Sequence, residues 1–235
     1  MERPYVVCHI LSALDGKISG DYAGLTVTRV ASEEYARIRT EYHAQAWLYG
    51  TTTTKEFTGY RKPALKPYYD DIPDGDYIAE TQLKFYYVSL DTEGEISWDS
   101  GVFHKSGRPD AHVIEILTNN TPVTYRAYLR EKGVSYIIAG EDSLDCRKAV
   151  EKLKQLFDID TLLICGGGTV NWSFVQQGVV DELSLLLAPA ADGSSSTPTI
   201  FEQSKFLKTS KPVEFKLKNV EQLKDSTVRL TYLVK

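Results

Sequence analysis

The sequence predicts an α/β fold in which a mostly parallel sheet is flanked by helices. Apolar runs of strand length alternate with helical patterns from residue 4 to residue 178, and such alternation is typical of parallel sheets. The apolar runs are nearly continuous, as in strands that are covered on both faces. The last two strand-like segments, 213–220 and 227–234, have no helical segment between them, so we expect an antiparallel pair that makes the sheet mixed.

The remaining elements follow from local patterns. Ser32 has the character of an N-cap, and the pattern after it predicts a helix to about residue 45. Pro122 opens a second helix that Gly133 closes, and Asp145 caps a third. A fourth helix should follow the glycines at 166–168 and end at residue 178. We expect strands at 4–13, 46–49, 83–90, 113–117, 134–139, 162–165 and 183–188.

Residues 57–80 break this periodicity and predict a long irregular excursion rich in tyrosine and proline. Loops of this length often act as lids or binding loops. No repeat, linker or low-complexity tract interrupts the chain. We therefore expect a single domain over residues 1–235.

Composition excludes several classes of protein. The net charge of −5 provides no basic field for nucleic acid, and no apolar run approaches the roughly 18 residues of a membrane span. The first residues show no signal-peptide pattern, and the three cysteines lack CxxC spacing. The four histidines are scattered without the spacing of metal ligands. We expect a cytoplasmic protein without a metal.

A glycine-rich turn is the strongest candidate for a binding site. An apolar strand, 162–165, leads directly into Gly166, Gly167 and Gly168, and Thr169 follows as a helix starter. A strand, a glycine turn and a helix N-terminus together present unpaired N–H groups and the positive end of a helix dipole. This arrangement predicts a site for a phosphate-bearing ligand, although a tight turn without a ligand would have the same sequence.

Two other expected strands also end in glycine followed by a hydroxyl or an acid, at Gly50-Thr51 and Gly140-Glu141. The threonine run 51–54 is equally compatible with a helix cap. If the three turns lie at one edge of a sheet, they line a crevice that suits an extended ligand with several phosphates, such as a dinucleotide. The Walker pattern for ATP is absent, and no Ser-His-Asp or Cys-His arrangement can be ordered.

The chain resembles the pyrimidine reductase family of riboflavin biosynthesis in segments 12–18, 133–142, 162–171, 178–185 and 189–193. These segments follow one another in order over nearly the whole chain. The resemblance implies a dihydrofolate-reductase-like fold and a homodimer. We expect no zinc-dependent deaminase domain of the kind that accompanies the reductase domain in the bifunctional members of the family, because none of its motif is visible in these residues.

The resemblance also implies hydride transfer from NADPH, with NADH not excluded, to C1′ of a ribosylamino-pyrimidine phosphate. The sugar opens to an imine, which is reduced to a ribityl chain. We expect Asp15 to be the acid–base group and Lys17 and Ser12 to position the substrate. Asp192 and Gly193 should form part of the substrate wall.

Glu182 either reaches the substrate or only caps a turn. The expected cofactor residues are Gly50, Thr51, Thr54, Ser89, Gly140, Glu141, Gly166, Gly167, Gly168 and Thr169. Ser89 would accept the 2′-phosphate of NADPH, which Asp91 would repel.

Two residues depart from the family pattern. Cys165 stands where the family usually carries Glu, and Trp172 stands where Gly is common. We expect these changes to alter the substrate and to narrow the pocket. Two alternatives remain open: a reductase of a different pterin- or pyrimidine-like ring, and a nucleotide-binding protein without turnover.

Overall fold

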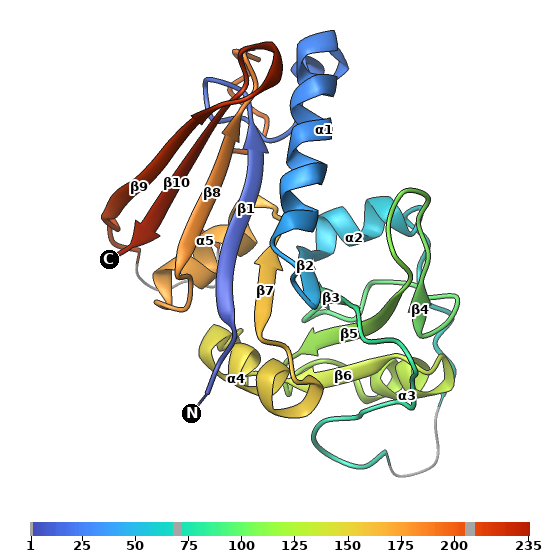
Figure 1. Cartoon of the computed structure of the whole chain (residues 1–235). Coiled ribbons are helices and arrows are strands. Elements are labelled where there is room, and N and C mark those ends of the chain that lie inside the picture. The colour runs from blue at the N-terminus through green and yellow to red at the C-terminus, as the bar shows by residue number, and fades with distance from the viewer. Residues whose placement is uncertain (1, 68–71, 205–209) are drawn as a thin grey trace. The chain divides into compact units, whose positions relative to one another are not determined.

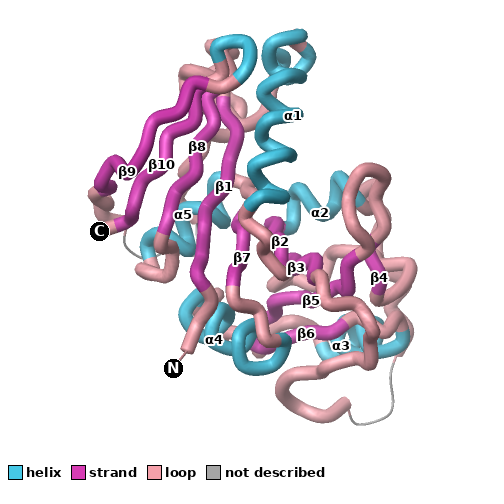
Figure 2. The backbone as a smooth tube through the Cα atoms, viewed as in Figure 1, coloured by secondary structure: helices cyan, strands magenta, loops and turns pink. Residues whose placement is uncertain are grey.

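The computed structural model describes residues 2–67, 72–204 and 210–235. The chain forms two compact units, the first from Met1–Pro4 with Gln45–Asp160 and the second from Tyr5–Ala44 with Thr161–Lys235. Figure 1 traces the elements, and Figure 2 separates helices from strands by colour. Each unit combines helices with strands.

The first unit is built on a parallel sheet. Strand β3 lies between β2 and β5, and β6 pairs with the later part of β5, all in parallel. The short β4 pairs antiparallel with the beginning of β5. The carboxyl ends of the four parallel strands therefore share one edge. The elements are β2 Ala46–Gly50, α2 Thr51–Phe57, β3 Tyr86–Leu90, β4 Val102–Phe103, β5 Ala111–Leu117, α3 Val123–Glu131, β6 Ser135–Ile138 and α4 Cys146–Phe157.

The core of this unit explains why its strands read as unbroken apolar runs. Every residue of β5 is buried, as is every residue of β2 and β6. The N-terminus of α4 is closed by Asp145, whose Oδ1 accepts a hydrogen bond from the Lys148 N–H at 2.9 Å, as its sequence position predicts.

The second unit carries a mixed sheet in the order β7-β1-β8-β10-β9. Strand β1 is parallel to β7 and β8, whereas β10 is antiparallel to β8 and β9. In Figure 1 the strands β1, β8, β10 and β9 run side by side. The elements are β1 Tyr5–Ser12, η1 Asp21–Gly24, α1 Thr26–Glu41, β7 Thr161–Ile164, α5 Gly168–Gln176, β8 Glu182–Leu187, β9 Phe215–Gln222, η2 Lys224–Ser226 and β10 Val228–Val234.

The structure confirms the predicted strand and helix order, including the antiparallel C-terminal pair, and corrects several boundaries. Helix α1 begins at Thr26 and not after Ser32. The Ser32 hydroxyl instead donates to the Thr28 carbonyl at 2.8 Å, an alternative that serine has inside a helix. The strand expected at 83–90 begins at Tyr86, and the two-residue β4 was not predicted.

The irregular excursion is confirmed in part. The described residues between Phe57 and Tyr86 form no helix and no regular strand, while residues 68–71 of the expected segment lie outside the described part of the chain. The threonine run is helical and forms most of α2, which is one of its two predicted readings. Within the described ranges, no helix is both long and apolar enough to cross a bilayer.

Candidate active site

A cluster of loops at the carboxyl ends of β1 and β8 brings several predicted residues together. Asp15 follows β1, and its Oδ2 accepts hydrogen bonds from the backbone N–H groups of Asp192 at 3.2 Å and Gly193 at 2.7 Å. These bonds, above all the one from Gly193, lower the pKa of Asp15 below its ordinary value. Asp15 is therefore an ionised carboxylate that is exposed and fixed to the loop after β8.

Asp192 extends this cluster. Its Oδ1 accepts from the Ser194 N–H at 3.2 Å, and its Oδ2 accepts from the Tyr22 N–H at 3.4 Å. A Cβ at Gly20 would lie 2.2 Å from Asp192 Oδ2, so the carboxylate rests directly on the glycine. Asp192 thus joins the loop after β8 to the segment that leads into η1.

Lys17 lies beside the segment 197–200. Its Nζ donates to the Thr197 carbonyl at 3.1 Å, and its backbone forms an isolated antiparallel bridge with Thr199. The Ile18 N–H donates to the Pro198 carbonyl at 3.0 Å, and the Ile200 N–H donates to the Gly16 carbonyl at 3.0 Å. The half-buried Lys17 is therefore held at a defined position near the carboxylate of Asp15.

The glycine turn lies between β7 and α5. Gly166 has φ +98°, a conformation that favours glycine, and the Gly166–Gly167 peptide is cis. Gly167 is the N-cap of α5, and no described side chain forms a capping hydrogen bond there. The first N–H groups of a helix have no intrahelical partner. The turn thus leaves the N-terminus of α5 without a side-chain cap, as an anion site requires.

The segment 197–202 packs on this turn at close range. A Cβ at Gly168 would lie 2.1 Å from the Thr199 carbonyl oxygen. The Glu202 N–H donates to the Gly168 carbonyl at 3.1 Å, and Glu202 Oε1 accepts from the Thr199 N–H at 2.9 Å. Glu202 is a site residue that the sequence analysis missed, because its role depends on contact with a glycine 34 positions earlier.

Asn171 is the second residue whose role was missed. Its side-chain Nδ2 donates to the Ile200 carbonyl at 2.9 Å, while its buried Oδ1 has no hydrogen-bond partner among the described residues. The spacing Gly-Gly-Gly-Thr-x-Asn was the available signal. Trp172, expected to narrow the pocket, packs against Phe201 and donates through Nε1 to Ser210 Oγ at 2.8 Å.

In the first unit, the carboxyl ends of β2 and β3 place the predicted cofactor residues next to each other. Gly50 caps α2 without a side-chain hydrogen bond from any described residue, and Thr51 Oγ1 donates to the Leu90 carbonyl at 2.6 Å. Thr54 and Ser89 are fully buried, and their hydroxyl oxygens lie 3.3 Å apart. The hydroxyls of Thr54 and Ser89 therefore face the interior of the unit.

Asp91 does not have the orientation that the sequence suggested. It is fully buried, and its carboxylate accepts from the N–H groups of Gly94, Glu95 and Ile96 at 2.7–3.1 Å. Burial nevertheless raises the pKa of Asp91 above its ordinary value. The carboxylate therefore organises its own loop and does not project its charge from the strand end.

The third glycine turn follows β6. Gly140 has φ +123°, and a Cβ there would lie 1.9 Å from the Ser143 carbonyl oxygen. The glycine is therefore required by the loop itself. Glu141 is exposed and accepts from Asn119 Nδ2 at 2.6 Å, which places both at the strand edge that also carries Gly50.

The other two predicted substrate residues lie at opposite ends of the strands: Ser12 is the last residue of β1, next to the loop cluster, and Glu182 is the first residue of β8. Ser12 is fully buried and donates to the Ala13 carbonyl at 3.0 Å. Glu182 begins β8, whereas the loop cluster follows the end of this strand. The Glu182 carboxylate accepts hydrogen bonds from the hydroxyls of Tyr42 and Tyr5 and from the Lys218 ammonium. Burial raises the pKa of Glu182, but the bonds from Lys218 and the tyrosines outweigh it and lower the pKa overall.

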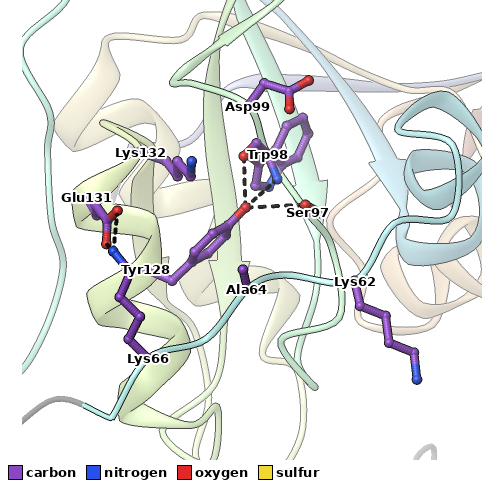
Figure 3. A pocket seen from close by; sticks show the side chains of 9 residues that line it. All are labelled: Lys62, Ala64, Lys66, Ser97, Trp98, Asp99, Tyr128, Glu131 and Lys132. Carbon is purple, nitrogen blue, oxygen red and sulfur yellow. Dashed lines mark hydrogen bonds and ion pairs between the residues drawn. The ribbon is translucent and has the colours of Figure 1, made fainter.

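A cavity of about 320 Å³ lies in the first unit, away from the strand ends (Figure 3). Its central side chain, Tyr128, donates to the Trp98 carbonyl and accepts from the Trp98 N–H, both at 2.8 Å. At its rim Lys66 pairs with Glu131 at 3.0 Å, and Asp99 pairs with Arg61 at 2.7 Å. These charges are largely neutralised by one another. No cluster of three metal-ligating side chains occurs among the described residues.

Substitution of Gly168 by alanine tests the close approach of the segment 197–202. The new Cβ would meet a backbone carbonyl, so either α5 or the segment must move, and we expect Gly168→Ala to lower the free energy of unfolding by about 1–3 kcal/mol. Gly24→Ala is the matched control, because nothing lies within 4 Å of its Cβ position. Equal urea midpoints for the two variants would contradict this packing.

The carboxylate of Asp15 should stabilise the loop cluster in a pH-dependent way. Its folded pKa is lowered, so its contribution is present above the unfolded value of about 4 and is lost as pH falls through the folded pKa. We expect Asp15→Asn to melt below the wild type at pH 7 and the gap to narrow in acid. A difference in melting temperature that stays constant with pH would show that the loop N–H groups do not depend on the ionised form of Asp15.

Comparison with known proteins identifies the family. A model described as the RibD C-terminal domain matches residues 4–228. The 2,5-diamino-6-ribosylamino-4(3H)-pyrimidinone 5′-phosphate reductase of Aquifex aeolicus is 25% identical over 226 residues, which cover 93% of this chain and 92% of the relative.

Solved structures show the same fold. Acinetobacter baumannii RibD, form 2, superposes with a TM-score of 0.66 at 22% identity, covering 99% of this chain but 58% of that longer chain. The Saccharomyces cerevisiae riboflavin biosynthesis reductase Rib7 superposes with a TM-score of 0.60 at 18% identity, covering 99% of this chain and 90% of that chain. The predicted dihydrofolate-reductase-like α/β class is thus confirmed. The match over nearly the whole sequence shows that the chain belongs to the RibD C-terminal domain family.

Proposed function

We propose that this chain is a riboflavin-pathway reductase that converts a ribosylamino-pyrimidine phosphate to its ribitylamino form with a nicotinamide cofactor. The observation that carries the proposal is the end-to-end match, over 93% of the chain, to a relative named as such a reductase. Because the family model also spans both units, we propose that together they form one reductase domain.

The geometry of the glycine turn fits a pyrophosphate. Gly167 leaves the N-terminus of α5 without a side-chain cap from the described residues, and the glycines allow a ligand to approach the backbone. We assign the pyrophosphate to Gly166 through Thr169. Gly50 and Thr51, at the start of α2, and Gly140 with Glu141 are further proposed contacts of the cofactor.

We propose NADPH as the cofactor. Repulsion of the 2′-phosphate by Asp91 is weaker than the sequence suggests, because the Asp91 carboxylate points into the loop 94–96. Its raised pKa also means that it is protonated more readily than an exposed aspartate. The buried hydroxyl of Ser89 does not support a direct contact with the 2′-phosphate. Discrimination between NADPH and NADH therefore rests on residues other than the side chain of Ser89.

When bound, the cofactor supplies the hydride. Asp15, ionised at neutral pH because its pKa is lowered, is suited to stabilise a cationic imine or to accept a proton. The Lys17 ammonium, fixed on the Thr197 carbonyl, is suited to donate a proton to the ring oxygen as the sugar opens. Asp192 and Gly193 hold Asp15 in place and form the proposed substrate wall.

We also propose a cytoplasmic homodimer. The three cysteines are buried and form no disulfide with one another, which is compatible with a reducing compartment. Leu217 and Val220 are half exposed on the edge strand β9, where apolar side chains favour self-association. Light scattering should give twice the chain mass, and a monomer at all concentrations would remove the dimer from the proposal.

Turnover of the substrate named for the Aquifex relative tests the function directly. We expect loss of nicotinamide absorbance when the chain is mixed with this pyrimidinone phosphate and NADPH, and little loss with its deaminated counterpart. Lys17→Gln should lower kcat about a hundredfold, in the range of general acid–base catalysis.

The outcomes separate the alternatives. Oxidation with a different pterin- or pyrimidine-like ring would retain the reductase and change its substrate. Cofactor binding by calorimetry without oxidation by any such ring would indicate a nucleotide-binding protein. Lys62→Gln, which removes an exposed ammonium of the cavity rim, is the matched control and should turn over like the wild type.

A further inference from the structure

Strands β4 and β5 of the first unit (Figure 1) are joined by a hairpin loop, residues 104–110, whose tip carries two cations, Lys105 and Arg108. A turn holds them together, because the Arg108 N–H donates to the Lys105 carbonyl at 3.0 Å. Gly107 has φ +77° in this turn. Both side chains are half-buried, so their positions are set by packing and not by free rotation.

Arg108 is fixed against aromatic rings. Its Nη1 donates to the Tyr49 hydroxyl at 3.0 Å. Its Cζ lies 4.8 Å from the ring centroid of Phe57, 5.5 Å from that of Tyr49 and 5.9 Å from that of Trp47. These contacts orient the guanidinium, and they use one of its five N–H donors.

Lys105 is held on the same ring. Its Nζ lies 3.6 Å from the centroid of Phe57. Burial lowers the pKa of Lys105, and the charge of Arg108 lowers it further, against a smaller opposing effect of Glu56. The two cations are therefore close enough to repel each other, which is an unfavourable arrangement unless something offsets it.

No carboxylate of the described residues forms an ion pair with either cation. The nearest acid in the sequence of the hairpin, Asp110, pairs instead with His104 Nδ1 at 2.5 Å. The tip therefore has two positive groups held by packing, with N–H donors left over and no ion pair to a described carboxylate; Glu56 acts on Lys105 only as a more distant charge. At the cavity of Figure 3, by contrast, the Lys66 ammonium is paired with the Glu131 carboxylate.

We propose that Lys105 and Arg108 form a binding site for the phosphate of a phosphate monoester. A guanidinium with its remaining N–H donors can bind two phosphate oxygens, and an adjacent ammonium adds a second positive charge. The rings beneath the cations are covered by them, so the site takes the phosphate group and offers no open face for stacking a base. A bound dianion would remove the repulsion between the two side chains.

The proposal is tested by titration of inorganic phosphate and of ribose 5-phosphate into the full chain, followed by calorimetry. We expect saturable binding by the wild type. Arg108→Met, which keeps an apolar stem over the rings, and Lys105→Gln should each weaken it about tenfold, as expected for loss of a charge-assisted hydrogen bond. Lys62→Gln, with the same change of net charge, should bind like the wild type.

The proposed site would be overturned if the wild type did not bind phosphate saturably, or if all variants bound it equally with unchanged thermal melting. Lys105 and Arg108 would then serve only to pack against the aromatic rings. Enzyme kinetics distinguish whether the bound phosphate belongs to the substrate or to a separate monoester. Only this part of the test rests on the proposed function. A raised KM with unchanged kcat in Arg108→Met would assign the site to the substrate's own phosphate, whereas an unchanged KM would assign it to a separate monoester. Phosphate binding is measured without turnover, so it stands or falls independently of the reductase assignment.

Discussion

A close backbone approach in the second unit, between Gly168 and the Thr199 carbonyl, constrains most of its proposed site. Only a residue without a Cβ leaves room for that carbonyl, which would lie 2.1 Å from the missing atom. The approach places the segment 197–200 where it can pair with residues 16–18. Lys17 gains its carbonyl partner from the same segment. The absence of a Cβ at Gly168 thus connects the start of α5 with the position of the Lys17 ammonium.

The same constraint shows what the sequence could predict and what it could not. Glycines between a strand and a helix have a local signature, so the turn at 166–168 was predictable. The burial of Thr54 and Ser89 was not, because it depends on the packing of neighbouring strands and on the contact between their hydroxyls. Ser32 failed as a helix start for a local reason, since its hydroxyl can bond inside a helix as well as at its end.

Carboxylates were the least predictable side chains. Three acids lie at strand ends and yet have different hydrogen-bond partners. Asp15 accepts from N–H groups of a loop distant in sequence, and Asp91 accepts from N–H groups of its own loop. Glu182 accepts from a lysine and two tyrosines. Their pKa values move accordingly, down for Asp15 and Glu182 and up for Asp91. Sequence position indicates where an acid lies along a strand, whereas its charge state depends on donors that are distant in sequence.

Acids satisfied inside the fold also determine where positive groups remain available. In the first unit Glu115 is fully buried and accepts a hydrogen bond from Trp98 Nε1 at 2.6 Å, and burial raises its pKa well above the ordinary value. Asp91 is buried in its loop in the same way. Neither carboxyl group forms an ion pair with Lys105 or Arg108, and exposed acids of the unit pair with other cations, as in Lys55–Glu95 and Arg61–Asp99. The guanidinium and the ammonium at the hairpin tip therefore keep N–H donors for an external anion, and a phosphate matches those donors.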